Sequence, residues 1–372
     1  STAKLTMMRD GAGEDGRMRG LFQYHGSSTG RWSGRRVQLQ NLPRPKFTQK
    51  IIDHIFEIFQ QDPATASGLI DMLYASPITA ISDCLRGCLI SDVGKDLIAA
   101  DLSSIEARVL AWLAGEEGTL EIFRGHGKIY EYEAGGIHGV SIDNVDEKQR
   151  QIGKVAVLSL GYGGGKGAFL QMAKNYAVKV SSERAEQIKV AWRYAHQNIV
   201  KYWYDLENAA MSATLNPGAT VLAGPRKFPE RQVKFKRAGS FLWAKLPSGR
   251  VICYPYPKIE EVEAPWGEKK EALTYMGVDA VSNKWVKEST YGGKIAENIT
   301  QALSRDILSE SMVRLEAAGY PITMHVHDEI VTEVYEGCGS VEEMERLMTV
   351  VPTWAEGLPL GAKGWRGKRF RK

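Results

Sequence analysis

Acidic residues end two short apolar runs that lie far apart in the chain. Residues 97–100 (Leu-Ile-Ala-Ala) predict a buried strand that ends at Asp101, and residues 322–334 predict two strands joined at Asp328-Glu329. A carboxylate beside buried strands is costly unless it binds a cation or faces water. Each segment also has an ordinary interpretation, because Asp101 could cap the helix that follows and Asp is common in turns. The two runs therefore predict strands with acidic ends, and a metal site is one function that they permit.

The composition is that of a soluble globular protein with a sizeable core. Hydrophobic residues make up 43% of the 372 residues and charged residues 25%. The sequence predicts no transmembrane helix and no signal peptide, because it lacks the apolar runs that both require. The four cysteines, among them Cys84 and Cys88, lack further zinc ligands at suitable spacing, so reduced thiols are expected. The net charge of +4 is compatible with nucleic-acid binding and equally with a mildly basic enzyme.

A helix predicted over residues 145–160 carries cations on one face. Arg150, Lys154, Leu158 and Tyr162 recur every four residues, so a helix places them in one row. Cationic side chains are what phosphoryl transfer requires near the phosphates, and the two larger apolar side chains could pack on a base. The row therefore indicates a surface that binds a nucleoside triphosphate.

The remaining segments predict helices, interrupted by one stretch of different composition. Helices are expected over residues 50–60, from Ser103 or Ser104 to about residue 114, over 181–212, and over 295–318. Residues 215–292 are richer in Gly, Pro, Trp and Tyr, with short β-like runs, and predict an irregular insertion or a small subdomain.

Polar residues between Ser28 and Pro43 could contact a nucleic acid. Arg31, Gln40 and Asn41 are of the side-chain types that bind base edges and sugars. Taken alone, this stretch could be any polar loop.

Four segments, in this order along the chain, resemble family A DNA polymerases, the DNA polymerase I family, in its phage type. Residues 29–43 resemble the family's Thr-Gly-Arg…Asn-Leu-Gln-Asn-Ile-Pro segment, and residues 101–108 resemble motif A. Residues 150–163 resemble motif B, and residues 327–329 (His-Asp-Glu) resemble motif C. Asp101 and Lys154 are 53 residues apart, which is the spacing expected between motifs A and B.

The resemblance implies a role for each matching residue. Asp101, Asp328 and the Leu102 carbonyl are expected to hold two Mg²⁺ ions, with Mn²⁺ as a substitute. The expected catalytic residues are Asp101, Asp328, Lys154 and Glu329. The expected nucleotide-binding residues are Arg150, Lys154, Leu158, Tyr162, Glu106 as steric gate, and Ser104. The expected DNA-binding residues are Arg31, Gln40, Asn41, Gln301 and His327.

The chain departs from the family pattern at several positions. Leu158 replaces the Phe or Tyr of motif B, which puts nucleotide selectivity in question, and Ser104 and Leu102 replace the Gln and Tyr of motif A. Residues 215–292 enlarge the spacing between motifs B and C. The thumb is expected to be largely absent, so the chain is interpreted as a fragment, a subunit of a split enzyme or a reduced polymerase.

The resemblance implies an α+β right-hand fold with an antiparallel palm sheet and mostly helical fingers. The palm sheet is expected from the strands near 97–101 and 322–334 together with residues 251–254. The expected domains are a first palm part (1–114), fingers (115–294), and a second palm part with a basic C-terminal tail (295–372). That tail, residues 363–372, could be solvated or could contact phosphates.

The expected reaction is addition of deoxynucleoside triphosphates to a primer 3′ end on a template, with release of pyrophosphate. The expected partners are primer-template DNA, these nucleotides, and a separate thumb or exonuclease segment or other replication proteins. The expected location is the bacterial cytoplasm, with no membrane partner. Two alternatives remain: a single-subunit RNA polymerase, against which Glu106 argues, and a DNA-binding subunit that needs an N-terminal partner for activity.

Overall fold

The computed structural model describes residues 2–74, 76–263, 267, 269–279 and 282–371. The chain divides into two compact units. The first unit comprises residues 1–103, 308–350 and 361–372, and the second unit comprises residues 104–307 and 351–360. Helix α12 (Gly292–Ala317) contributes residues to both units.

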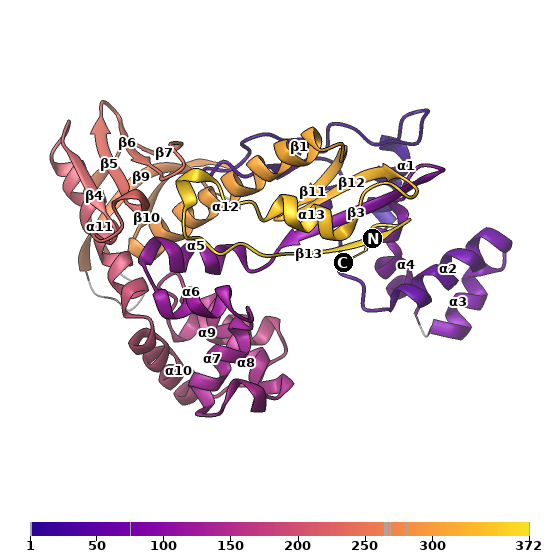
Figure 1. The fold of residues 1–372 in the computed structure, drawn as a ribbon, viewed down its shortest axis with the longest axis horizontal. Helices are drawn as coiled ribbons and strands as arrows, with labels where there is room; N and C mark the ends of the chain where they lie inside the picture. The colour runs from indigo at the N-terminus through magenta and orange to yellow at the C-terminus, as the bar shows by residue number, and fades with distance from the viewer. Residues whose placement is uncertain (1, 75, 264–266, 268, 280–281, 372) are drawn as a thin grey trace. The chain divides into compact units, whose positions relative to one another are not determined.

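An antiparallel sheet of four strands forms the centre of the first unit (Figure 1). Its strands, in spatial order, are β11 (Ile322–Val326), β12 (Glu329–Tyr335), β3 (Lys95–Leu102) and β13 (Ala362–Gly367). Helix α13 (Val341–Met348) packs against β3 and β13, and the Gly364 N–H donates to Glu345 Oε1 at 2.7 Å. The predicted α+β class with an antiparallel sheet is confirmed.

One strand of this sheet was assigned wrongly from the sequence. Residues 251–254 do form a strand, β7 (Val251–Pro255), but β7 pairs with β6 in a separate sheet of the second unit. The fourth strand is β13, from the segment predicted as a basic tail. Phe370 beyond it is buried, and Arg366 and Lys368 bind Asp96 through contacts of 2.7 Å. The tail is therefore part of the fold through residue 371, and Lys372 lies outside the described residues.

The first unit has a second region of short helices. These helices are α1 (Thr2–Gly11), α2 (Gln49–Gln61), α3 (Ala66–Tyr74) and α4 (Pro77–Cys84), with 3₁₀ turns η1 (Leu39–Asn41) and η2 (Arg86–Cys88) and the short strands β1 (Phe22–Gln23) and β2 (Ser33–Gly34). Helix α2 confirms the helix predicted over 50–60, and its buried side chains are Ile52, Ile55 and Ile58. Cys84 is buried, which raises the pKa of its thiol to about 12 and keeps it protonated at neutral pH.

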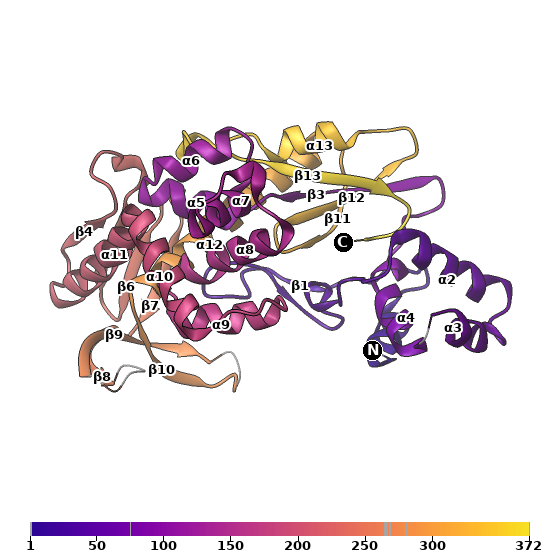
Figure 2. The ribbon, with the colours of Figure 1, turned by 90° about the horizontal axis from the view of Figure 1, so that it is seen from below.

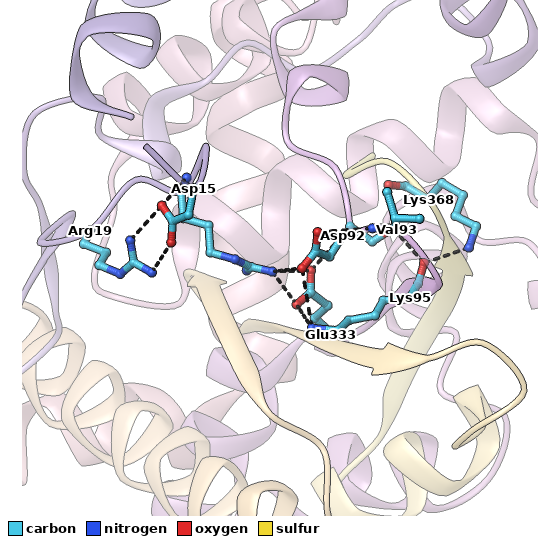
Figure 3. Close-up of polar contacts among 9 residues, drawn as sticks. Asp15, Arg19, Asp92, Val93, Lys95, Glu333 and Lys368 are labelled. Carbon is cyan, nitrogen blue, oxygen red and sulfur yellow. Dashed lines mark hydrogen bonds and ion pairs between the residues drawn. The ribbon is translucent and has the colours of Figure 1, made fainter. Parts of the chain in front are cut away.

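A buried carboxylate joins β12 to the segments before β3 (Figure 3). Glu333 accepts hydrogen bonds from Arg17 at 2.8 Å, from Lys95 at 3.3 Å and from the Asp92 N–H at 2.9 Å. Burial raises the pKa of Glu333, but the three donors lower it by more, so the pKa lies below its usual range. This carboxylate therefore stays charged and stabilises the sheet.

Helices make up the first part of the second unit (Figure 1). They are α5 (Ile105–Ala114), α6 (Glu117–Arg124), α7 (Ile129–His138), α8 (Glu147–Leu160), α9 (Lys166–Asn175), α10 (Ser182–Ala195) and α11 (Gln197–Leu215), with the 3₁₀ turn η3 (Ile142–Asn144). Two more 3₁₀ turns of this unit come later in the chain, η4 (Pro229–Arg231) and η5 (Thr353–Ala355). The helix predicted over 181–212 is two helices, because the backbone leaves the helical region at His196. The sequence offers Asp143 or Asp146 as the start of α8, and the structure has Asp146 as its N-cap, in a capping box with Gln149.

Two antiparallel sheets follow the helices of the second unit (Figure 2). One has the order β4 (Thr220–Ala223), β5 (Val233–Ala238), β6 (Phe241–Lys245) and β7, and the other has β10 (Trp285–Thr290), β9 (Lys269–Val278) and β8 (Lys258–Glu263). The stretch was predicted to be an irregular insertion or a small subdomain with short β-like runs, and its described residues form these two regular sheets. In α12, Ile299, Leu303 and Ile307 recur every four residues on one helix face, and all three are fully buried. No described helix is long and apolar enough to span a membrane.

Candidate active site

The acids of the predicted motifs A and C meet at one end of the first unit's sheet. Asp101 near the end of β3 lies opposite Glu329, the first residue of β12. The Leu102 N–H donates to the Asp328 carbonyl oxygen at 3.1 Å. The Asp101 and Asp328 side chains are both partly exposed, whereas Glu329 is only 1% exposed. The structure therefore brings the predicted acids of motifs A and C together at one end of two paired strands, with Asp101 and Glu329 in the strands and Asp328 in the adjoining loop.

The motif C hairpin turns one residue earlier than the sequence suggested. Its two-residue loop is His327-Asp328, and Glu329 already belongs to β12. His327 is exposed and has a φ of 57°, the left-handed conformation that a tight hairpin loop requires. Asp328 therefore stands in the loop itself, while Glu329 faces inward and accepts a hydrogen bond from Trp365 Nε1 at 3.3 Å.

A neutral histidine supports this hairpin from β11. His325 is buried, with its ring centroid 4.4 Å from that of Phe22 and 4.8 Å from that of Trp32. Burial, and secondarily the nearby His327, lower the pKa of His325 to about 4. His325 is therefore uncharged at neutral pH, and its role is to pack the hairpin against the N-terminal segment.

The donor atoms at this sheet end are suitable for Mg²⁺. Among the described residues, no group of three or more His, Cys, Asp or Glu side chains is placed to hold a metal ion. Mg²⁺ does not need such a cage, because it is usually held by one or two carboxylates together with water and substrate phosphates. The carboxylates of Asp101 and Asp328 and the Leu102 carbonyl are oxygen donors of this type.

The predicted DNA-contact loop lies in the same unit. A turn at residues 27–30 precedes Arg31, whose N–H donates to Ser27 Oγ at 3.0 Å. Gln40 and Asn41 belong to the turn η1, and Asn41 Nδ2 donates to Gln38 Oε1 at 2.8 Å. Asn41 is exposed, and Arg31 and Gln40 are partly exposed.

In the second unit, α8 presents the predicted cations. Arg150 Nε donates to Glu131 Oε1 at 2.8 Å, and Lys154 Nζ lies 4.6 Å from the Tyr176 ring centroid. Leu158, one turn further along, is 39% exposed. The helix ends at Leu160, so Tyr162 lies just beyond it instead of on its last turn.

Helix α8 is held close to α7 by a glycine. A Cβ atom at Gly153 would lie 2.1 Å from the Tyr130 carbonyl oxygen, so a larger residue does not fit between the two backbones. This contact sets the position of α8 and thus of Arg150 and Lys154 on either side of Gly153.

The predicted steric gate contacts the motif B tyrosine. Tyr162 OH donates to Glu106 Oε2 at 3.1 Å, joining the first turn of α5 to the turn that follows α8. Burial and the Glu106 carboxylate raise the pKa of Tyr162 well above its usual value, so the hydroxyl stays protonated and can donate. Glu106 is therefore held in one orientation.

The two other predicted residues of this unit lie at helix positions. Ser104 is the N-cap of α5 with a φ of 51°, but its side chain makes no capping hydrogen bond. Gln301 lies in α12, and its Nε2 donates to Glu297 Oε1 at 3.0 Å.

Two residues near the acids were missed by the sequence analysis. Lys363 on β13 lies directly opposite Asp101, and Trp365 on the same strand donates to Glu329. The signal for their strand was an alternation of side chains in residues 362–367, but the glycines and basic residues of this segment obscured it. Glu131, the partner of Arg150, was also missed, because nothing in its own segment indicates that contact.

Residues 2–238 match the sequence model of DNA polymerase family A. That match includes the segments of Asp101 and Lys154 and ends before the hairpin with Asp328. The chain belongs to DNA polymerase family A.

The chain resembles particular members of this family to different degrees. It is 41% identical to the DNA polymerase of Bacillus phage SP02, over 100% of this chain and 55% of that protein. It is 27% identical to DNA polymerase I of Treponema pallidum, over 58% of this chain and 18% of that protein. The chain spans about half the length of its phage relative.

The fold also resembles a solved structure of the POL domain of Pol1 from M. smegmatis, in complex with DNA primer-template and dNTP. The TM-score is 0.58 at 18% identity, and the match covers 99% of this chain and 51% of that chain. At this level of identity the likeness concerns the fold alone.

Proposed function

We propose that the chain carries out template-directed DNA synthesis, adding deoxynucleoside triphosphates to a primer 3′ end with release of pyrophosphate. One observation carries this proposal: in a chain of family A, the acids of motifs A and C lie on neighbouring strand ends of one antiparallel sheet. Carboxylates at rigid strand ends, partly open to solvent, are suited to hold cations that act on phosphates.

Two divalent cations would be held by Asp101, Asp328 and the Leu102 carbonyl, with Mg²⁺ as the physiological ion and Mn²⁺ as a substitute. When bound, such ions supply positive charge to the attacking and leaving oxygens of the reaction. Glu329 contributes to catalysis from its buried place beside Asp101, where its contact with Trp365 fixes it.

Arg150 and Lys154 on α8 bind the triphosphate of the incoming nucleotide. Glu131 holds Arg150 in place, and the Tyr176 ring supports the Lys154 ammonium. Leu158 on the same helix faces the sugar and base, where its 39% exposed side chain leaves an apolar surface. Because Leu has no ring, its contact with the nucleotide differs from that of an aromatic residue.

Glu106 excludes ribonucleotides. Its carboxylate is oriented by the hydrogen bond from Tyr162, and a fixed carboxylate can occupy the space that a 2′-hydroxyl would need. Ser104, at the start of the same helix, lies at the position of motif A that contacts the nucleotide. A preference for deoxynucleotides is what separates this proposal from a single-subunit RNA polymerase.

The first unit corresponds to the palm and most of the second unit to the fingers. Arg31, Gln40, Asn41 and His327 of the first unit, and Gln301 of the second, contact primer-template DNA. The longer relatives leave room for a further segment, such as a thumb or an exonuclease, that would act together with this chain in the cytoplasm of a bacterial host.

Primer extension by the purified chain tests the proposal. The chain is mixed with a labelled primer-template, Mg²⁺ and one nucleotide at a time, and the product is resolved by length. The proposal expects incorporation of the deoxynucleotide complementary to the template base, well above its ribonucleotide. Absence of templated incorporation, both alone and with the N-terminal half of the phage relative added, would overturn it.

A further inference from the structure

The sheet β4-β5-β6-β7 of the second unit has two chemically different faces. The cross-strand register places alternate residues on each face. One face is buried, with Val233, Phe235, Leu242, Ala244, Ile252 and Tyr254 all no more than 5% exposed. Helix α11 packs on this sheet, and Arg237 donates from the buried side to the Thr214 carbonyl oxygen at 2.9 Å. The other face is directed outward.

The outward face carries cations and no acids. Lys234 and Lys236 on β5 and Lys245 on β6 are all exposed. The described positions of this face are Thr220, Leu222, Lys234, Lys236, Ala238, Phe241, Trp243, Lys245, Val251, Cys253 and Pro255, and none of them is Asp or Glu. Lys234 lies directly opposite Lys245 in the register. Like charges in that arrangement destabilise a sheet, so an anionic ligand would relieve a cost that the fold otherwise carries.

Aromatic rings lie among these lysines. Trp243 is directly opposite Lys236, and Phe241 lies two residues along the same strand, with the two ring centroids 5.4 Å apart. Tyr256, just after β7, is 55% exposed and lies 6.5 Å from Phe241, centroid to centroid. Neighbouring side chains on one sheet face lie about 5–7 Å apart, so rings and ammonium groups can contact one nucleotide together.

This combination has a specific chemical partner. Aromatic rings on an open sheet face stack with unpaired bases, while lysines beside them neutralise phosphates. A protein partner would be expected to pair with acids as well as cations, and a duplex would hide its base faces from the rings. We propose that the outward face of the β4–β7 sheet binds single-stranded DNA.

A groove of about 1160 Å³ lies beside the edge strand, between β4 and α11. Its lining includes Thr220 and Leu222 of the outward face, the cations Lys201, Arg226 and Lys227, and one acid, Asp205. On a templated polymerase, the single strand available to such a face is the unpaired template or a displaced strand.

Binding of a labelled oligothymidine of about 20 nucleotides, longer than typical sheet-based sites, tests the proposal by fluorescence anisotropy. Trp243→Ala is expected to weaken binding about 5- to 150-fold, because one stacking contact is lost. The double variant Lys234→Ala/Lys245→Ala is expected to reduce the slope of log Kd against log salt by about 1.4, as for two lost phosphate contacts.

Matched variants separate this face from general effects. Tyr204→Ala removes an exposed ring from α11, and Lys50→Ala/Lys284→Ala removes two exposed lysines elsewhere. Both controls are expected to bind like the wild type, and circular dichroism melts show which variants remain folded. Equal affinity and salt slope in the face variants and the controls would overturn the proposal. So would competition by a blunt duplex as strong as that by the single strand, since it would exclude stacking.

The proposal is independent of the polymerase assignment. Oligothymidine binding needs neither metal nor nucleotide. If the face variants lose this binding but still extend primers on short templates, the result supports the single-strand site without bearing on the polymerase assignment. If extension fails while single-strand binding depends on Trp243 and the lysines, the proposed function is contradicted and this inference stands.

Discussion

The contact between α7 and α8 predicts that the same substitution, Gly→Ala, changes the free energy of unfolding in opposite directions at two glycines. Gly153 in α8 has no room for a side chain, because a Cβ there would lie 2.1 Å from the Tyr130 carbonyl oxygen and 2.9 Å from the Ala134 nitrogen. Gly136 in α7 has no atom within 4 Å of the same position. Both glycines lie inside helices, so Ala gains about 1 kcal/mol of helix propensity at either.

The expected changes in the free energy of unfolding follow from these distances. Because Cβ contacts below 3.0 Å are essentially never seen, Gly153→Ala must separate the two backbones by about 1 Å. Overpacking costs about 1–3 kcal/mol, and a backbone neighbour cannot rotate away, which places this site at the upper end. With the propensity gain subtracted, we expect Gly153→Ala to lower the free energy of unfolding by roughly 2 kcal/mol and Gly136→Ala to raise it by up to about 1 kcal/mol.

Urea unfolding, with hydrogen exchange of the α7 and α8 amides, measures both changes. The exchange data assign the loss to this helix pair and not to the first unit. A wider separation should also displace Arg150 and Lys154 and weaken apparent nucleotide affinity in Gly153→Ala alone. If Gly153→Ala proves as stable as Gly136→Ala, the described contact between α7 and α8 is incorrect.

Three further predictions concern single side chains. Glu333→Gln should lower the free energy of unfolding by about 1–3 kcal/mol at pH 7. Because the pKa of Glu333 in the folded protein is below the usual 4.5, this stabilisation is present above about pH 4.5 and is lost as the pH falls below it. A stability difference between wild type and variant that persists in acid would contradict the assignment. Glu106→Ala should raise ribonucleotide incorporation relative to deoxynucleotide incorporation, and Tyr162→Phe should do so more weakly, because it frees the Glu106 carboxylate. Steady-state kinetics with ribo- and deoxynucleotides would reject the steric gate if the incorporation rates of both substrates fall equally. Lys154→Ala should raise the apparent nucleotide KM and lower the rate, whereas Leu158→Phe should change the acceptance of dideoxynucleotides. An unchanged nucleotide response in Lys154→Ala would show that α8 does not bind the nucleotide.

Features that depend on nearby residues could be predicted from the sequence. The spacing of Ile299, Leu303 and Ile307 predicts one buried helix face, and all three are fully buried in α12. Asp146 could be proposed as a helix start because its capping partner, Gln149, is three residues away. The strand ending at Asp101 was visible because a buried strand is a short apolar run.

Pairing between distant segments could not be predicted. Residues 251–254 have the pattern of a strand, but the pattern does not specify the sheet, and β7 pairs with β6 and not with β3. Strand β13 was hidden because two glycines and two cations interrupt its alternation, although Lys363 and Trp365 lie beside Asp101 and Glu329. The break at His196 has no Gly or Pro to signal it, and the helix ends there nonetheless.

Single-turnover incorporation by Asp101→Ala and Asp328→Ala tests the central claim most directly. Asp101 lies near the end of β3 and Asp328 in the loop that leads into β12, the strand paired with β3. In the proposed function, removing either residue takes away a ligand of cations that stabilise transition-state charge by several kcal/mol. We therefore expect each variant to fall below about 1% of the wild-type rate, while its affinity for primer-template changes less than about threefold. Asp71→Ala, which removes an exposed acid from α3 of the same unit, should react like the wild type. Retention of more than a few per cent of the rate by Asp101→Ala or Asp328→Ala, with DNA binding intact, would contradict the account.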